Sequence, residues 1–421
     1  MKVKVVNFGP IEDADFELGD VTVVIGPNAS GKSFLSFMLY SVLNARPSAN
    51  PDDLKTIPSG KFNLSSYLDM INNVLSRTLK ERFDDLFGVK FNELITIGRE
   101  ESRITFTDET VGNLKIVLGK DFKAEIELYK DPEVFVSFTE IANIPIGFIG
   151  AKTFQTSRGD FKIEIYYGTE ALGPSDKKLD ELLENMKKET LASALADLVL
   201  GLFFKKFKSA EILPTERNLV ISNLLGYIST YISIDKLSDK LSKVSDKPAI
   251  RHFVRSLMNA MRILRGEEIS ISTFNLKCKV VEPFVLEVYE KGERIPLPLI
   301  SSGYAQVLPV HILSMFGRFL IIEEPELNLH AGAQVRVADY LYDLVEREDK
   351  RLFLTTHSDI FAIQMAINHV KRGRDKGKTL KIYLLNKGKT EEISYTERGD
   401  IESIPTITDV IREQVKAIYG E

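Results

Sequence analysis

One octapeptide near the N-terminus constrains the fold of this chain more than any other feature. An apolar run over residues 21–25 leads into it, and an apolar helical pattern over residues 32–43 follows it. Its glycines let backbone N–H groups turn inward around a phosphate, and the helix that starts there adds the positive end of its dipole. The octapeptide is Gly26-Pro27-Asn28-Ala29-Ser30-Gly31-Lys32-Ser33, which matches G-x-x-x-x-G-K-[ST]. The sequence therefore predicts a nucleotide-binding loop between a buried strand and a helix.

Two side chains of this loop have distinct predicted roles. The Lys32 ammonium is expected to reach the β- and γ-phosphates, and the Ser33 hydroxyl is expected to bind Mg²⁺. The rest of the loop is expected to contact the nucleotide mainly through its backbone.

Paired carboxylates end a second apolar strand. The run Phe-Leu-Ile-Ile at residues 319–322 leads directly into Glu323 and Glu324. At the end of a strand beside a phosphate site, the first carboxylate lies near Mg²⁺ and the second can polarise the attacking water. A buried strand that meets an acidic surface turn is the plainer interpretation, and it loses weight beside a phosphate-binding loop.

Two further segments are candidates for phosphate contacts. His357 follows the strand pattern of residues 352–354, so its side chain is expected to sense the γ-phosphate from the same crevice, although a single His is more often structural. Ser301, Ser302 and Gly303 open a helix, and such a helix start binds anions. Because the chain already has one such site, the second suggests phosphate binding in trans, and hence a dimer. Residues 214–217 (Pro-Thr-Glu-Arg) are a weaker candidate, for which a structural turn is an equal interpretation.

Hydrophobic periodicity predicts the fold class. From Gly303 onward, helices and strands alternate, which predicts a parallel sheet with crossover helices. Residues 93–168, including 94–97, have the pattern of an antiparallel meander, and residues 178–264 have a helical pattern. We therefore predict an α/β P-loop NTPase fold with a mainly parallel core sheet, an antiparallel β-subdomain and a helical insertion. The expected boundaries are 1–50 with 266–421 for the ATPase head, 51–175 for the β-subdomain and 176–265 for the insertion.

Composition limits the environment and the partners. The net charge of −5 creates no general attraction for nucleic acid, so a DNA partner requires a local basic patch. The single cysteine, Cys278, excludes a disulfide framework within the chain and indicates a reducing cytoplasm. The apolar stretch 307–322 is broken by Pro309, His311 and Arg318, so we expect a buried helix and strand there and no membrane segment.

In this order, the motifs resemble those of the ABC ATPase superfamily. They correspond to Walker A at 26–33, the signature at 300–303, Walker B at 319–324, the D-loop at 325–330 and the switch histidine at 357. The text Glu-Glu-Pro-Glu-Leu-Asn-Leu-His at 323–330, with the segments 7–9 and 19–28, is similar to RecF/SMC-like and OLD-type ATPases. The resemblance covers about residues 1–45 and 295–390, the two lobes of one head.

The resemblance implies an ATPase that uses ATP and Mg²⁺ and forms a homodimer when ATP binds. Glu324 would be the catalytic glutamate, assisted by Lys32 and His357, and Glu323 would stand where many relatives have the Mg²⁺-associated aspartate. Ser301 and Gly303 would contact the γ-phosphate held by the partner subunit. Gln155 is the candidate for the Q-loop residue that contacts ATP and Mg²⁺.

Three departures from the family pattern stand out. Tyr304 replaces the usual Gln or Glu after the signature glycine, and Glu323 is longer than Asp, which puts the metal geometry in doubt. No long coiled coil lies between residues 34 and 300, as a full-length SMC protein would have. The segment after His357 lacks a carboxylate-rich Toprim module, so no nuclease activity is expected.

Other classes of protein fit less well. Asn386-Lys387-Gly388-Lys389 imitates the base-reading motif of a small GTPase but has Lys where Asp is needed, and the histidines lack the spacing of a zinc site. Transporter ATPases have a shorter span between P-loop and signature.

The partner of the expected switch is predicted to be double-stranded DNA, in repair, maintenance or defence. The basic segments 203–208 and 371–378 are the candidate contacts, with solvated surface turns as the plainer interpretation. The alternative is an ATP-gated protein-interaction module, the ATPase component of a defence or toxin-linked system, whose helical insertion binds a protein.

Overall fold

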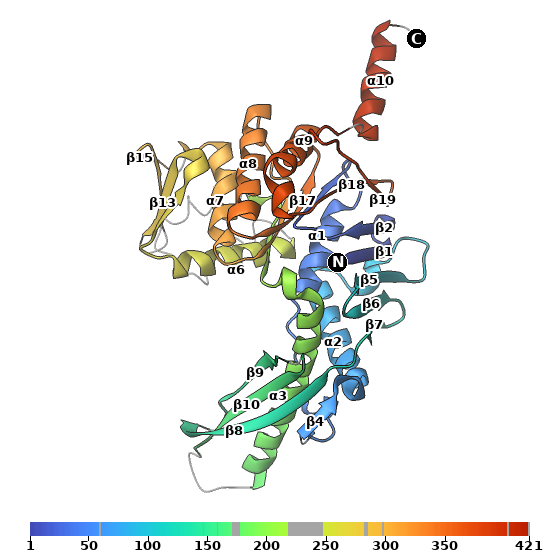
Figure 1. Cartoon of the computed structure of the whole chain (residues 1–421), viewed down its shortest axis with the longest axis vertical. Coiled ribbons are helices and arrows are strands. Elements are labelled where there is room, and N and C mark those ends of the chain that lie inside the picture. Colours follow the sequence, from blue (N-terminus) through green and yellow to red (C-terminus); the bar gives the residue numbers. More distant parts are fainter. Residues whose placement is uncertain are drawn as a thin grey trace. The chain divides into compact units, whose positions relative to one another are not determined.

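The computed structural model describes residues 1–58, 60–145, 147–157, 159–170, 177–217, 247–281, 285–296, 299–401 and 404–419. These residues form two compact units (Figure 1). The first unit contains residues 45–82 and 99–206 with Met1, and the second contains residues 2–44, 83–98 and 207–421. The P-loop, the carboxylate strand and His357 all belong to the second unit.

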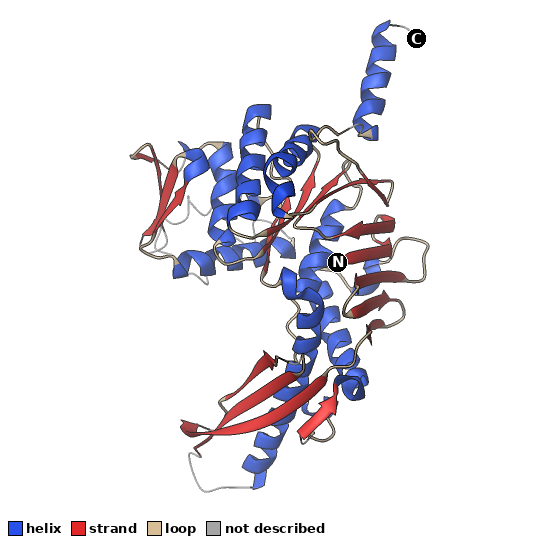
Figure 2. Ribbon diagram, in the orientation of Figure 1, coloured by secondary structure: helices blue, strands red, loops and turns tan. Residues whose placement is uncertain are grey.

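A mainly parallel sheet forms the core of the second unit (Figure 2). Five neighbouring strands run parallel in the order β11-β16-β17-β3-β18, and β19, β2 and β1 continue the sheet in that order. The pairs β18–β19 and β2–β1 are antiparallel. Their bounds are β11 (Ala210–Leu213), β16 (Phe319–Glu323), β17 (Arg351–Thr356), β3 (Val21–Ile25), β18 (Leu380–Asn386), β19 (Lys389–Glu392), β2 (Ile11–Glu17) and β1 (Lys2–Phe8).

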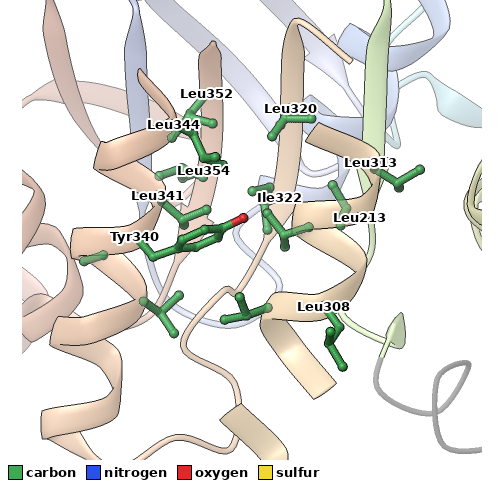
Figure 3. Close-up of a cluster of buried hydrophobic side chains, with 14 of the residues drawn as sticks. Leu213, Leu308, Leu313, Leu320, Ile322, Tyr340, Leu341, Leu344, Leu352 and Leu354 are labelled. Atoms are coloured by element: carbon green, nitrogen blue, oxygen red, sulfur yellow. The ribbon is translucent and has the colours of Figure 1, made fainter. Parts of the chain in front are cut away.

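Helices cover this sheet and explain the continuous apolar runs of its central strands. Every residue of β3 and of β16 is buried, as expected for parallel strands that are covered on both faces. The helices are α1 (Lys32–Leu43), α6 (Pro248–Ile263), α7 (Ser302–Ser314), α8 (Ala331–Arg347) and α9 (Asp359–Asn368). Figure 3 shows one buried cluster that contains side chains of the helices, among them Leu308 of α7 and Leu341 of α8, and side chains of the strands, among them Ile322 of β16 and Leu354 of β17. The prediction of a P-loop α/β fold with a mainly parallel core is thus confirmed.

The second unit also contains a small antiparallel sheet and a terminal helix. The small sheet has the order β12-β13-β14-β15, and the buried Cys278 lies on its second strand. The bounds are β12 (Glu268–Ile271), β13 (Leu276–Val281), β14 (Val285–Glu290), β15 (Glu293–Ile295) and α10 (Pro405–Tyr419).

The first unit is built from two groups of strands and two helices. Strands β5, β6 and β7 form an antiparallel meander, and β4, β8, β10 and β9 form a sheet in that order. The long helix α3 contacts β9 and β10, and α2 begins in this unit and ends in the second. The bounds are β4 (Gly60–Asn63), α2 (Leu68–Phe87), β5 (Ser102–Asp108), β6 (Gly112–Leu118), β7 (Phe122–Leu128), β8 (Glu133–Pro145), β9 (Ile149–Gln155), β10 (Phe161–Glu170) and α3 (Lys177–Phe204).

Several local expectations differ from this structure. Residues 94–97 are not a strand, because the chain forms a 3₁₀ turn over Phe91–Leu94. Strand β10 pairs with β8 in parallel, so the meander ends at β7. The predicted helical stretch 178–264 contains strand β11, whose apolar residues are buried beside β16, and its residues 218–246 lie outside the described residues.

The two units also differ from the expected three-part division. Helix α3, from the expected insertion, packs on strands of the expected β-subdomain, whereas β11 and α6 belong with the P-loop. In the described part of the chain, no helix is both long enough and apolar enough to cross a membrane.

The packing of α8 on the sheet predicts a large effect of truncating Leu341, which is fully buried. Replacement of Leu341 by Ala should lower the free energy of unfolding by about 2–5 kcal/mol, because it removes buried methyl groups and leaves a cavity. Urea unfolding followed by circular dichroism measures this change. The matched control is Ile97→Ala, whose side chain is 99% exposed and whose expected effect is within about 0.5 kcal/mol. Equal midpoints for the two variants would contradict this description of the core.

Candidate active site

Three strands of the core sheet deliver the predicted site residues to one edge. Strand β3 ends at the P-loop, β16 ends in Glu323, and β17 lies between them and ends just before His357. The register places Glu323 opposite Thr355 and Thr356 opposite Ile25. Because neighbouring parallel strands end together, residues that are about 300 positions apart in the sequence meet at the carboxyl edge of the sheet.

The P-loop needs glycine where the chain is crowded. A Cβ atom on Gly26 would lie 2.2 Å from the carbonyl oxygen of Leu385, and Gly31 has a φ of 109° at the start of α1. Ala29 also has a positive φ, of 60°. These values bend the loop into the tight turn that the sequence pattern predicts, with α1 beginning at Lys32 as expected.

The Lys32 side chain folds back along the loop. Its Nζ atom donates hydrogen bonds to the carbonyl oxygens of Gly26 (2.9 Å) and Pro27 (2.8 Å). Burial lowers the pKa of Lys32 to about 8, while the nearby charges of Glu324, Glu326 and Glu323 act in the opposite direction. Lys32 is thus a buried cation that is held within the loop and faces three carboxylates.

Glu323 and Ser33 have the properties of a magnesium site. Glu323 is only 2% exposed and shares a side-chain hydrogen bond with Ser33, while its Oε1 atom has no hydrogen-bond partner. Burial raises the pKa of the Glu323 carboxyl to about 7. A hydroxyl and a carboxylate oxygen are ligands that Mg²⁺ accepts. The described ranges contain no cluster of three or more His, Cys, Asp or Glu residues that could hold a metal, so phosphate and water would have to complete the coordination shell.

Glu324 is held differently from its neighbour. It is a half-buried residue with a φ of 43°, and its Oε1 atom lies 3.2 Å from His357 Nε2. The hydrogen bond with His357 lowers the pKa of Glu324, as do the charges of Lys32 and Arg217. A carboxylate that is kept ionised at the rim of a phosphate site can polarise a water molecule.

The sequence predicts two buried charged residues of this site only as members of segments, Glu326 within the D-loop at 325–330 and Arg217 within the weaker candidate 214–217. Glu326 is 7% exposed and accepts hydrogen bonds from the Thr356 hydroxyl (2.7 Å) and the His357 main-chain N–H (2.8 Å), which fixes the start of the His357 loop. Arg217 is fully buried and donates to the main-chain oxygens of Glu323 and Glu324. The only sequence signals were a third carboxylate after Pro325 and an arginine in the segment 214–217.

A cavity of about 460 Å³ lies in front of these groups. Residues 28–34 of the P-loop and its helix line it, together with Pro10, Glu324 and His357. Its volume lies within the range of about 300–1,000 Å³ that is usual for small-molecule sites. The structure therefore brings the P-loop, Glu324 and His357 together around one cavity.

The predicted signature segment lies outside that cavity. Ser301 caps α7, where its Oγ atom accepts a hydrogen bond from the N–H of Tyr304 at 3.4 Å, and both Ser301 and Ser302 are exposed. Ser302 donates to the carbonyl oxygen of Asn328 in the D-loop at 3.4 Å. The Tyr304 hydroxyl donates to Glu290 at 2.5 Å, so this departure from the family pattern ties α7 to β14.

Gln155 lies in the first unit, where it is an exposed residue at the end of β9. Its assignment as the Q-loop residue for ATP and Mg²⁺ stays a prediction.

The two basic segments make contacts within the chain that their sequences do not indicate. In the segment 371–378, Arg372 pairs with Asp343 and Glu346, Lys376 pairs with Glu346, and Lys378 pairs with Asp349 at 2.5 Å. In the segment 203–208, the three aromatic side chains are buried, namely Phe203, Phe204 and Phe207. Neither segment therefore presents the interleaved basic and aromatic surface that would favour nucleic acid.

The chain matches a known protein family. The sequence model of a family described as an AAA ATPase domain matches residues 1–362. No curated protein sequence matches the chain.

Similarity to solved structures is distant. An SMC head bound to the C-terminal winged-helix domain of ScpA is 11% identical, with 97% of this chain and 98% of that chain covered and a TM-score of 0.38. The SMC head domain from Thermotoga maritima is 11% identical, with coverage of 94% and 98% and a TM-score of 0.35. The recombination mediator RecF is 12% identical, with coverage of 93% and 97% and a TM-score of 0.33. Because these scores are low, the fold assignment depends on the strand order and the family match.

The raised pKa of Glu323 predicts how stability depends on pH in the absence of Mg²⁺ and nucleotide. Between its ordinary value of 4.5 and about 7, the folded protein holds a proton on Glu323 that the unfolded chain releases. The free energy of unfolding should therefore fall as pH rises through this window, by at most about 3 kcal/mol from this group. Glu323→Gln should lose less stability than the parent between pH 5 and pH 8, measured by urea unfolding in EDTA.

Glu324→Gln is the matched control for this prediction. Because the pKa of Glu324 is lowered from its ordinary value of 4.5, the contribution of Glu324 to the free energy of unfolding changes only at more acidic pH. It stays constant between pH 5 and pH 8. Parallel pH profiles for the parent and Glu323→Gln would contradict the assignment of a buried, proton-holding Glu323.

Proposed function

Because the chain belongs to the AAA ATPase domain family, we propose that it is an ATP-driven switch, in which ATP joins two copies of the chain and hydrolysis releases them. The chain binds and hydrolyses ATP, as the family assignment states. The composite active site, made from the P-loop of one copy and the signature segment of the other, is the proposed part.

One observation carries the proposal of a dimer. The N-terminus of α7 exposes Ser301 and Ser302, yet these residues do not line the cavity that the P-loop forms. A helix start with exposed hydroxyls is suited to bind an anion. Its contact with the D-loop through Asn328 ties it to the strand that carries the two glutamates. A phosphate held by the P-loop of a second copy would bind to this exposed start of α7.

Within one copy, each residue has a physical role in hydrolysis. The P-loop N–H groups and Lys32 would hold the phosphates, and Ser33 and Glu323 would hold Mg²⁺, which supplies charge neutralisation. Glu324 would orient and polarise the attacking water, because its carboxylate is ionised and points into the cavity beside His357. His357 would hold Glu324 in place through the 3.2 Å contact and face the γ-phosphate.

The proposed switch predicts that Glu324→Gln binds ATP, hydrolyses it slowly and accumulates as a dimer in MgATP. Glutamine keeps the shape of the side chain but removes the charge that polarises water, so dissociation after hydrolysis should be blocked. Sedimentation velocity with and without MgATP measures the dimer. Lys32→Ala, which should lose nucleotide affinity, is the control that should remain monomeric under both conditions.

A second substitution tests the trans contact itself. Adding Ser301→Arg to Glu324→Gln places a bulky side chain on the exposed start of α7, which is not part of the lining of the P-loop cavity. The double variant should bind ATP as the parent does and remain monomeric. If it dimerised normally, the proposed trans role of the signature would be wrong.

The identity of the partner is a separate question. The sequence predicts duplex DNA as the partner, and the single cysteine predicts a cytoplasmic location. The alternative is a protein partner that the expected insertion binds. It is favoured by the ion pairs in the segment 371–378 and by the buried aromatic residues of the segment 203–208. Both candidates share the same ATP-dependent dimer.

Binding of labelled duplex DNA to Glu324→Gln, with and without MgATP, separates the two candidates. At about 0.15 M salt, nonspecific attraction is largely screened. Binding that requires MgATP would support a DNA clamp. A Glu324→Gln dimer that binds no DNA in either state would reject DNA as the partner and leave the protein-interaction module as the proposed function.

A further inference from the structure

The turn that follows β11 lies directly beside the carboxylate strand. Strand β11 runs parallel to β16, and its last pair is Leu213 with Ile322, one residue before Glu323. The chain then turns over residues 214–217, and the N–H of Arg217 donates to the carbonyl oxygen of Pro214 at 3.2 Å. The turn thus places an arginine next to the end of β16.

The Arg217 guanidinium bonds to main-chain atoms of both site glutamates. Its Nη1 atom donates to the carbonyl oxygens of Glu323 and Pro214, the latter at 2.9 Å, and its Nη2 atom donates to the carbonyl oxygen of Glu324 at 2.8 Å. The two Nη atoms of the planar guanidinium each bind one of these successive carbonyl oxygens, a two-nitrogen fork that a lysine at position 217 would not reproduce. The side chain therefore binds the peptide groups on both sides of the Cα atom of Glu324.

The charge of Arg217 is retained in this buried place. Burial lowers the pKa of Arg217 to about 10, and the charges of Glu326, Glu323, Glu324 and Glu216 oppose this shift. The guanidinium is therefore protonated at neutral pH. An unpaired buried charge is costly, so the surrounding carboxylates help to stabilise the buried guanidinium of Arg217.

Glu324 needs such support because of its backbone conformation. Its φ of 43° lies in the left-handed region, which non-glycine residues adopt at a cost and keep only where the surroundings fix it. Its N–H donates to the carbonyl oxygen of Thr355 at 2.8 Å, and its carbonyl oxygen accepts from Arg217. Both main-chain polar groups of Glu324 are therefore held, which directs its side chain toward His357 and the cavity.

We propose that Arg217 is a positioning residue for ATP hydrolysis, which holds the main chain of Glu323 and Glu324 so that the Glu324 carboxylate meets the attacking water. Arg217 does not line the cavity and touches no reacting atom. The inference rests on the proposed role of Glu324 in hydrolysis and is independent of which partner the switch acts on.

The direct test is steady-state ATP hydrolysis by Arg217→Lys. The substitution keeps the positive charge but loses the fork that binds two carbonyl oxygens. We expect kcat to fall by about 10–100-fold, as for a misplacement of the catalytic group by about 1 Å, with KM and ATP affinity nearly unchanged because the P-loop is intact. The matched control is Arg372→Lys, an arginine of the same unit whose carboxylate partners, Asp343 and Glu346, lie on α8. This control should hydrolyse ATP at the parental rate.

A double-substitution cycle separates positioning from a general loss of structure. If Arg217 acts through Glu324, Arg217→Lys should cause no further loss of hydrolysis in a Glu324→Gln background, because the group being positioned is already disabled. Independent losses that multiply in the double variant would overturn the proposal. So would an unchanged kcat, or equal losses of ATP affinity and kcat.

A milder variant covers the case in which substitutions at Arg217 prevent folding. Glu216→Gln keeps Arg217 and removes the ion pair between Glu216 and Lys247, which fixes the same turn. It should lower kcat by a smaller factor without changing KM, and an unchanged kcat in this folded variant would then overturn the proposal. Absence of hydrolysis in the parent protein would instead refute the proposed function, so the two failures are distinguishable.

Discussion

The parallel pairing of β16, β17 and β3 is the constraint on which the candidate site depends. Strands β3 and β16 are buried along their length and β17 is buried beyond Arg351, so charged side chains are least costly where the strands end. The register sets those ends side by side, with Glu323 opposite Thr355 and Thr356 opposite Ile25. A slip of one residue in either pair would turn the apolar side chains of these strands to the wrong face and separate the P-loop from its carboxylates.

Two adjacent glutamates acquire opposite properties from this arrangement. Glu323 continues the buried strand, and burial raises the pKa of its carboxyl to about 7. Glu324 leaves the strand through a left-handed conformation and meets His357, whose hydrogen bond lowers the pKa of Glu324. Pairs of titratable groups whose environments separate their pKa values are typical of sites that divide roles between two carboxylates. The division here arises from one change of backbone direction, which Arg217 and Thr355 hold in place.

The sequence was sufficient for the parts of the site that are encoded locally. The P-loop, the start of α1 at Lys32 and the strand before Glu323 depend on neighbouring residues, and their predictions agree with the structure. Long-range contacts could not be predicted in this way. Arg217 is about 100 positions from its partners, and a buried arginine that binds main-chain oxygens has no pattern in its own segment. The segment 94–97 has a strand-like pattern, yet its pairing with β1 is limited to an isolated bridge between Ile95 and Phe8.

The same long-range effect changes the argument about a charged partner. The segment 371–378 looked like a phosphate-binding loop because its cations are adjacent in sequence. The carboxylate partners are Asp343 and Glu346 on helix α8 and Asp349, which follows the helix. Arg372, Lys376 and Lys378 are therefore paired within the chain. Phosphate binding gains affinity mainly when cations neutralise phosphates and release counterions. A phosphate contact by any of these three cations would first have to displace a carboxylate, which reduces what they can add to DNA affinity.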